Sequence, residues 1–196
     1  MAIIQPSKPW TAASINFLTQ NEMRRLLDAI DSKRDYAIFL LAYRHGLRAS
    51  EIGMLSTADL DVKQYRLRIH RLKNSLEGLH PLQPDEEKAL NAYIKERNSN
   101  VPALFLSRNT TPISRRRLDE LMKHYGERAS IPESKRHFHA LKHSIATHLL
   151  DAGADLRFVQ DCIGHASIRN TVIYARLTSR RRDEEARKVF ASQYGV

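Results

Sequence analysis

Six residues, spread over most of the chain, carry side chains that together could bind an anionic group and form a covalent bond to it: Arg48, Lys73, His139, Lys142, His165 and Tyr174. Arginine and lysine stabilise negative charge as it develops, and histidine exchanges protons near neutral pH. A tyrosine hydroxyl can act as a nucleophile, although its reference pKa of about 10 makes it a poor one unless nearby charge favours the phenolate. These residue types therefore favour covalent chemistry at an anionic centre.

Taken one at a time, these residues also have simple structural explanations. Arg48 follows a glycine that is placed to end a helix, and a lone arginine there is usually a surface residue. Lys73 lies in an expected hairpin loop, where most lysines are solvated. His165 follows Gly164 and fits a turn, and Tyr174 fits an ordinary half-buried tyrosine. No single residue of the set identifies a function.

A metal site at His139 and His143 is one alternative, because the two residues lie four apart on an expected helix. No glutamate follows His139, however, so the zinc-hydrolase pattern with its general base is absent. The chain has one cysteine, Cys162, which excludes an internal disulfide and a cysteine-based zinc site. We therefore expect no metal and no cofactor.

The order and spacing of the six residues resemble the tyrosine recombinase (phage integrase) family. Its pattern is an arginine, a hairpin lysine, a His-x-x-Arg motif, a histidine or tryptophan, and a tyrosine. The run GLRASE at 46–51 resembles the first arginine box, and HALKH at 139–143 resembles the second. The run LRFVQDCIGH at 156–165, with Tyr174 nine residues later, resembles the closing signature. The resemblance covers about residues 17–178.

The layout is most similar to the short single-domain recombinases that invert bacterial fimbrial promoter switches, since only a short arm precedes the motifs. The runs HRLK at 70–73, HPL at 80–82 and FLSR at 105–108 add to this likeness. A truncated piece of a longer integrase is the alternative.

The resemblance implies that Tyr174 attacks a DNA phosphate, giving a 3′-phosphotyrosyl link and a free 5′ hydroxyl. Arg48 and His165 would stabilise the negative charge on that phosphate. Lys73 would protonate the leaving 5′ oxygen, and His139 would assist as acid or base. A hydroxyl from a partner strand would then rejoin the DNA without ATP or metal.

One position departs from the family pattern, which has arginine where this chain has Lys142. Arginine grips two phosphate oxygens with a planar fork, whereas lysine is a flexible point charge. Arg136 and Arg157 are nearby in sequence but do not occupy the motif position. The lysine is compatible with an engineered change, with a slow enzyme, or with a regulator that binds DNA without cutting it efficiently. If Lys142 contacts phosphate, arginine there should speed cleavage.

The composition favours a polyanionic partner. Thirty-two Lys and Arg against 22 Asp and Glu give a net charge of +10 and a pI near 9.9. Each phosphate that a basic surface neutralises releases counterions, so we expect double-stranded DNA as the partner. By family likeness we also expect a tetramer on paired DNA sites, with accessory DNA-bending proteins. The sequence has neither a membrane-length apolar run nor a signal peptide, which favours a cytoplasmic, nucleoid-associated protein.

Three other functions remain open. A non-catalytic DNA-binding regulator on the same fold would explain Lys142. A topoisomerase would use similar chemistry as a monomer. A helix-turn-helix transcription factor would read DNA with the basic helix at 114–128, but it leaves the ordered set of site residues unexplained.

Hydrophobic periodicity predicts a mainly α-helical domain with a small antiparallel β-sheet. Residues 1–16 are expected to form an N-terminal arm, 17–178 the catalytic domain, and 179–196 a helix or tail that packs in cis or on a neighbouring subunit. A capping box, Thr19 with Glu22, should start the first helix, and Gly46 should end a central helix at 35–45. Further helices are expected at 84–97, 114–128, 138–149, 155–163, 167–175 and 182–193, and strands at 65–70, 79–82 and 104–106. We assign Glu51 to support of Arg48.

Overall fold

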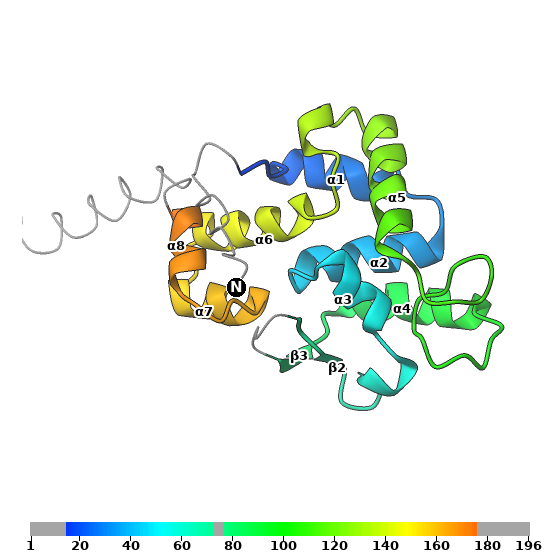
Figure 1. Cartoon of the computed structure of the whole chain (residues 1–196). Helices are drawn as coiled ribbons and strands as arrows, with labels where there is room; N and C mark the ends of the chain where they lie inside the picture. The colour runs from blue at the N-terminus through cyan, green and yellow to red at the C-terminus, as the bar shows by residue number, and fades with distance from the viewer. Residues whose placement is uncertain (1–14, 73–76, 176–196) are drawn as a thin grey trace, which may run out of the picture.

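Helices dominate the part of the chain that the computed structural model describes, residues 15–72 and 77–175 (Figure 1). The α-helices are α1 (Gln20–Asp28), α2 (Lys33–Arg44), α3 (Ala49–Met54), α4 (Pro84–Glu96), α5 (Arg115–Arg128), α6 (Ala140–Asp151), α7 (Leu156–Ile163) and α8 (Arg169–Ala175). Strands β1 (Leu60–Asp61), β2 (Arg66–Ile69) and β3 (Gly78–Pro81) form an antiparallel sheet, and 3-10 turns occupy η2 (Thr57–Asp59) and η3 (Glu133–Lys135). The predicted fold class is confirmed.

Some predictions fall on residues outside the described ranges. These are most of the N-terminal arm, the hairpin residue Lys73 and the terminal helix at 182–193. Among the helices that are described, none is both long and apolar enough to cross a membrane.

The helix boundaries follow from capping side chains and from glycines. At the start of α1, Thr19 Oγ1 accepts a hydrogen bond from the Glu22 amide at 3.2 Å, and the Glu22 carboxylate accepts one from the Thr19 amide at 2.7 Å. This is the predicted capping box. Gly46 (φ +56°) lies just beyond α2, and Gly164 (φ +66°) caps α7. Because left-handed backbone is cheap only for glycine, both positions turn the chain, and each turn leads into a residue of the predicted site.

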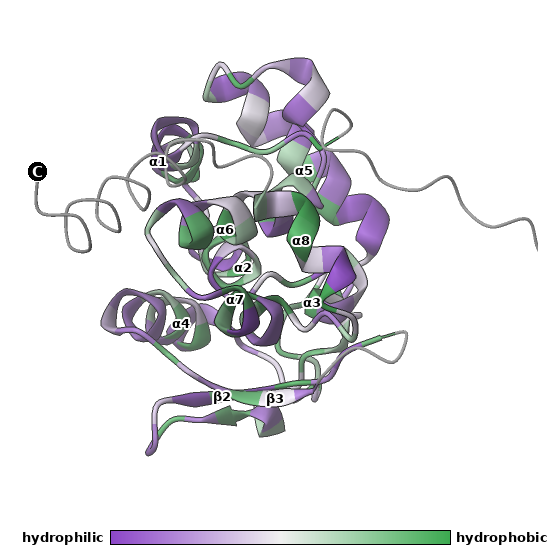
Figure 2. Ribbon diagram, turned by 90° about the vertical axis from the view of Figure 1, so that its left-hand side faces the viewer, coloured by the Kyte–Doolittle hydropathy of each residue, from purple (hydrophilic) through white to green (hydrophobic). Residues whose placement is uncertain are grey.

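The sheet lies along one edge of the molecule, below the helices (Figure 2). β2 pairs with β3 so that Leu67 lies opposite His80, which confirms the predicted hairpin. The sequence pattern did not predict β1, which pairs with the other edge of β2. Along β2, Leu67 and Ile69 are buried, and Arg66 and Arg68, which alternate with them, are exposed. The alternation predicted from the sequence therefore sets which face of the strand meets the helices.

The strand predicted at 104–106 is wrong. Leu106 forms an isolated bridge to Pro112 and joins no ladder of the sheet. The backbone groups of Leu104 are instead used by other partners: its amide donates to Leu55 O at 2.7 Å, and its carbonyl accepts from the Tyr93 hydroxyl at 3.1 Å. The segment is buried like a core strand, but a side chain and a loop satisfy its backbone.

Helices α2 and α6 contribute many of the buried residues of the core. α2 is buried from Ala37 to Ala42 and packs against α4 and α6, as its apolar sequence predicted. α6 is buried nearly all round, not only along the predicted stripe. Its first turn joins the larger hydrophobic cluster, and its later turns join a second cluster with α7 and α8. Polar residues of α6 are therefore held inside the protein.

Gly46→Ala should destabilise the protein more than Gly153→Ala. Both glycines have positive φ, +56° and +94°, so each alanine costs about 1–2 kcal/mol in backbone strain. A Cβ at 46 would also lie 2.9 Å from Ile163 Cγ2, whereas one at 153 would meet nothing within 4 Å. We expect an additional loss on the order of 1–3 kcal/mol for Gly46→Ala, measured by denaturant unfolding. Equal losses would mean that the packing of Gly46 on α7 contributes nothing.

Candidate active site

Arg48 begins the site at the turn between α2 and α3. It is the N-cap residue of α3, and its amide donates to Glu51 Oε2 at 2.9 Å. Its guanidinium Nη1 donates to Glu51 Oε1 at 2.7 Å. The Arg48 side chain is 27% exposed while that of Glu51 is fully buried. Glu51 therefore orients a guanidinium that stays within reach of solvent, in agreement with its expected support role.

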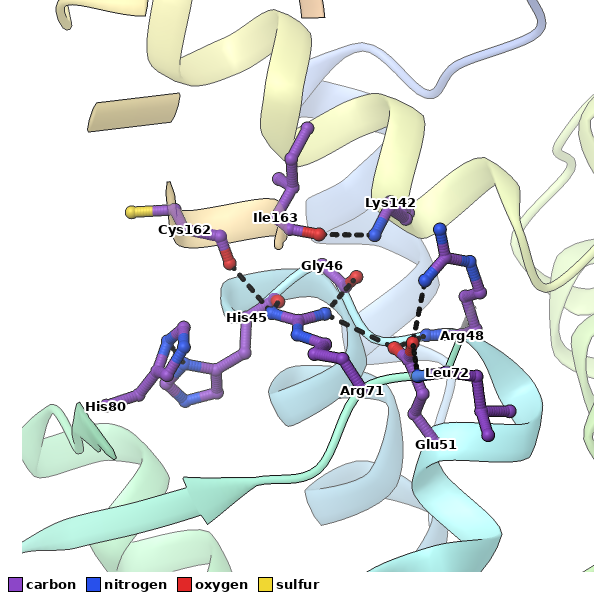
Figure 3. Close-up of polar contacts among 10 residues, drawn as sticks. All are labelled: His45, Gly46, Arg48, Glu51, Arg71, Leu72, His80, Lys142, Cys162 and Ile163. Carbon is purple, nitrogen blue, oxygen red and sulfur yellow. Dashed lines mark hydrogen bonds and ion pairs between the residues drawn. The ribbon is translucent and has the colours of Figure 1, made fainter. Parts of the chain in front are cut away.

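Arg71 is the second guanidinium of the site, and the sequence analysis missed it. Its Nη1 donates to Gly46 O at 3.1 Å and pairs with Glu51 Oε2 at 3.2 Å (Figure 3). Its Nη2 donates to His45 O at 2.8 Å and Cys162 O at 2.9 Å. One buried side chain thus ties together the end of α2, the start of α3 and the end of α7.

A sequence signal for the burial of Arg71 does exist. The alternation along β2 places Leu67, Ile69 and Arg71 on the same inward face. An arginine at the next inward position predicts a buried guanidinium that needs backbone partners. Gly164 allows the close fit, because a Cβ there would lie 2.6 Å from Arg71 Nε.

Glu51 is the negative charge of this network. Burial alone would raise the pKa of its carboxyl group. The Arg48 amide and the charges of Arg71 and Lys142 outweigh that effect and lower the pKa of Glu51. The carboxylate therefore remains ionised inside the protein.

Lys142 lies on α6 and is completely buried. Its ammonium nitrogen donates to Ile163 O, at the C-terminal end of α7, at 2.5 Å (Figure 3). Lys142 is therefore not a solvated surface lysine, because its amine is held by a backbone carbonyl inside the protein. Burial lowers the pKa of Lys142 well below its ordinary value, and the nearby charges of Arg48 and Arg71 lower it further.

Three histidines surround this lysine. His139 is the N-cap residue of α6, His143 lies one turn further along, and His165 follows the glycine that ends α7. The rings of His139 and His143 meet edge-on, with centroids 4.5 Å apart. Burial, with a further contribution from the charge on Lys142, lowers the pKa of each of the three to about 3. All three are therefore neutral at pH 7.

Tyr174 lies on α8 and is 2% exposed. Its hydroxyl oxygen is 2.8 Å from His143 Nδ1, and its ring stacks beside that of His165 with centroids 6.2 Å apart. His165 Nδ1 in turn lies 3.1 Å from Thr171 Oγ1. Burial raises the pKa of Tyr174, against a smaller opposing effect from the charge on Arg48.

The structure thus brings together five of the six predicted residues, and the sixth, Lys73, lies outside the described ranges. Arg136 and Arg157 do not substitute for the missing arginine. Arg136 donates to Ile131 O at 2.6 Å, and Arg157 is exposed in the first turn of α7, at the opposite end from the site. In the described part of the chain, no group of three or more His, Cys, Asp and Glu residues is placed to hold a metal ion.

The arrangement is that of a tyrosine recombinase catalytic domain. Residues 16–181 match the sequence model of the Phage integrase family, and the chain belongs to that family. The family membership expected from the sequence is confirmed. The protein is therefore a site-specific DNA recombinase of the tyrosine class.

Named relatives agree with this assignment. Type 1 fimbriae regulatory protein FimE of Escherichia coli K12 is 36% identical over 167 residues, which cover 81% of this chain and 84% of that protein. Tyrosine recombinase XerA of Pyrococcus furiosus is 33% identical over 168 residues, covering 83% of this chain but 58% of that protein. A crystal structure of XerA recombinase has a TM-score of 0.75 at 25% identity, covering 99% of this chain and 67% of that one.

Glu51→Gln should destabilise the protein by about 3–5 kcal/mol at pH 7, because it leaves buried cations without their counter-charge. Glu120→Gln is the matched control, since Glu120 pairs with two exposed arginines on α5 and its loss should change stability far less. The pKa of Glu51 is lowered on folding, so its contribution is present above the unfolded pKa and is lost as pH falls through the folded pKa. Denaturant unfolding measured over a range of pH should therefore show the stabilities of the wild-type protein and of Glu51→Gln converging in acid. A difference between them that does not depend on pH would contradict this account.

Proposed function

We propose that this recombinase cleaves and rejoins DNA strands through a 3′-phosphotyrosyl intermediate on Tyr174. The observation that carries the proposal is the convergence of Arg48, Lys142 and His165 around one tyrosine, from α3, α6 and the end of α7. A cationic pocket stabilises the charge that builds on a phosphate under attack, and a buried hydroxyl is protected from water.

Arg48 is the cation that meets DNA first in this mechanism. Its guanidinium is partly exposed and is oriented by the bond to Glu51. A guanidinium held in this way can bind phosphate oxygens with charge-assisted hydrogen bonds. The phosphate also brings negative charge to a site of neutral histidines, so its arrival raises the pKa of His139 and His165 and favours their proton donation.

Lys73 is proposed to protonate the leaving 5′ oxygen. It belongs to the connection between β2 and β3, two positions beyond Arg71. The support for this role is the family pattern together with the anchoring of Arg71 in the site.

The substrate in this proposal is double-stranded DNA, bound by the catalytic domain at residues 17–178. A tetramer acts on paired sites with accessory DNA-bending proteins, and the outcome is inversion of the segment between the sites. The net charge of +10 and the likeness to FimE over 84% of its length support this view. Mapping covalent adducts on the flanking genomic DNA tests it: adducts at two inverted sites are expected, and adducts without paired sites would contradict inversion.

A weakened, mainly DNA-binding regulator is the second candidate, and the state of Lys142 favours it. Its ammonium is committed to Ile163 O, and its lowered pKa reduces the positive charge available to a phosphate. A nicked suicide substrate separates the two candidates, because an active enzyme accumulates covalent protein–DNA complex and a regulator does not.

Tyr174→Phe should abolish covalent attachment to the nicked substrate while leaving DNA affinity nearly unchanged, since the hydroxyl supplies the nucleophile and little binding energy. Tyr125→Phe is the matched control, because this buried tyrosine donates its hydroxyl to Asp35 at 2.9 Å, away from the site. Denaturing gels of the adduct measure both. Adduct that persists in Tyr174→Phe would locate the nucleophile elsewhere.

Lys142→Arg should raise the single-turnover cleavage rate most at high pH. The lysine has a lowered pKa, so its charge is lost as pH rises through that value, whereas arginine stays protonated. At a pH where the lysine is neutral, we expect a barrier lower by about 1–3 kcal/mol in the variant. A variant slower at every pH would instead mean that the buried pocket fits only lysine, and an unchanged rate in both Lys142→Arg and Lys142→Ala would remove this residue from the active site.

A further inference from the structure

We propose that His143 is a catalytic residue that accepts the hydroxyl proton of Tyr174 during strand cleavage, an inference that rests on Tyr174 being the nucleophile. His143 entered the sequence analysis only as half of a metal alternative. In the structure its Nδ1 lies 2.8 Å from the Tyr174 hydroxyl oxygen, and both side chains are buried. A proton acceptor must lie within hydrogen-bond reach of the proton it takes, and His143 meets that condition before DNA arrives.

The other two histidines of the site face different partners. The Nδ1 of His165 lies 3.1 Å from Thr171 Oγ1, and its ring stacks beside the ring of Tyr174. His139 meets His143 edge-on. In the described part of the chain, His143 is the histidine with a ring nitrogen at hydrogen-bond distance from the reacting oxygen.

The surroundings keep the His143 ring neutral, as an acceptor must be. Burial lowers its pKa to about 3, and the neighbouring groups His139, His137 and Lys142 act in the same direction. With its proton on Nε2, the neutral ring presents a lone pair at Nδ1 to the tyrosine hydroxyl.

Complete proton transfer before attack would be unfavourable, because the pKa of Tyr174 is raised and that of His143 is lowered. The transfer must therefore accompany bond formation, since the tyrosine oxygen loses its basicity as it becomes an ester. The resulting imidazolium would form beside the negative charge that builds on the phosphate, which favours the charged ring at that moment.

The step balances without any further reagent. The O–H bond of Tyr174 breaks, its proton goes to His143 Nδ1, and the oxygen forms the bond to phosphorus. The bond from phosphorus to the 5′ oxygen breaks, and that oxygen takes the proton proposed to come from Lys73. In rejoining, the 5′ hydroxyl attacks and returns its proton to Lys73, while His143 returns its proton to the departing tyrosine.

His143→Asn tests this role in the whole 196-residue chain, because the amide oxygen of asparagine can replace Nδ1 as a hydrogen-bond acceptor but is not basic. Single-turnover cleavage of the nicked substrate should fall about 100- to 10,000-fold, with DNA affinity unchanged. His148→Asn is the matched control. His148 lies on the same helix, is buried, and has its Nδ1 2.9 Å from the Tyr43 hydroxyl, so its variant should cleave at the wild-type rate.

A fluorinated tyrosine at position 174 separates proton transfer from mere positioning. Fluorine makes the hydroxyl more acidic and reduces its need for a base. It should therefore speed His143→Asn by a much larger factor than it changes the wild-type protein. His143→Gln, measured in the same way, covers the case in which the asparagine variant does not fold.

Three results are informative. Cleavage by His143→Asn at the wild-type rate, or equal effects of fluorination in both backgrounds, would overturn the inference while leaving Tyr174 as the nucleophile. Adduct formation by Tyr174→Phe would instead overturn the proposed function itself. Loss of cleavage in His143→Asn, recovered in part by the fluorinated tyrosine, is the result that we expect.

Discussion

The ion pair between Glu51 and Arg71 is the interaction on which the site depends. Removing an ion from water is costly unless an opposite charge and hydrogen bonds replace the solvent. In this pair, the charge of Glu51 compensates Arg71 for its lost hydration, and Arg71 does the same for Glu51. Arg71 also donates to carbonyls at the ends of two helices, so the charge pair ties the end of α2 to the end of α7. Glu51 then holds Arg48 on the solvent side of the same network. The position of the arginine that we propose binds phosphate is thus set by a fully buried carboxylate.

The balance of charge around this pair is uneven. One buried carboxylate, Glu51, faces two guanidinium groups and the amine of Lys142. Burial, together with this excess of positive charge, lowers the pKa of the site histidines to about 3, which is why they are neutral at pH 7. In the mechanism that we propose, a DNA phosphate would supply the anion that this balance lacks. Binding and activation would then be parts of one event, because the substrate would change the protonation of the groups that act on it.

Most of the fold could be predicted from the sequence, because its signals are local. Capping residues, glycines and hydrophobic periodicity predicted the hairpin and the described helices other than α3, whereas the prediction at 104–106 failed because distant groups satisfy its backbone. The residues of the site were predicted from their order and spacing along the chain. That order indicates the family, but it does not predict which side chains contact one another. Neither the partners of Arg71 nor the bond between His143 and Tyr174 has a local signature, since each joins segments far apart in the chain. The burial of Lys142 likewise depends on α7 and α8 closing over α6.

The contact between Gly164 and Arg71 has an evolutionary consequence. A side chain at 164 would overlap the guanidinium, so as long as Arg71 is present, position 164 is restricted to glycine. A lineage that first loses Arg71 can accept a residue that tolerates left-handed backbone at 164, such as asparagine, and can then no longer regain the arginine without a clash. The order in which the two substitutions occur therefore matters. Among descendants of this protein, position 164 should therefore depart from glycine only where Arg71 has already been lost.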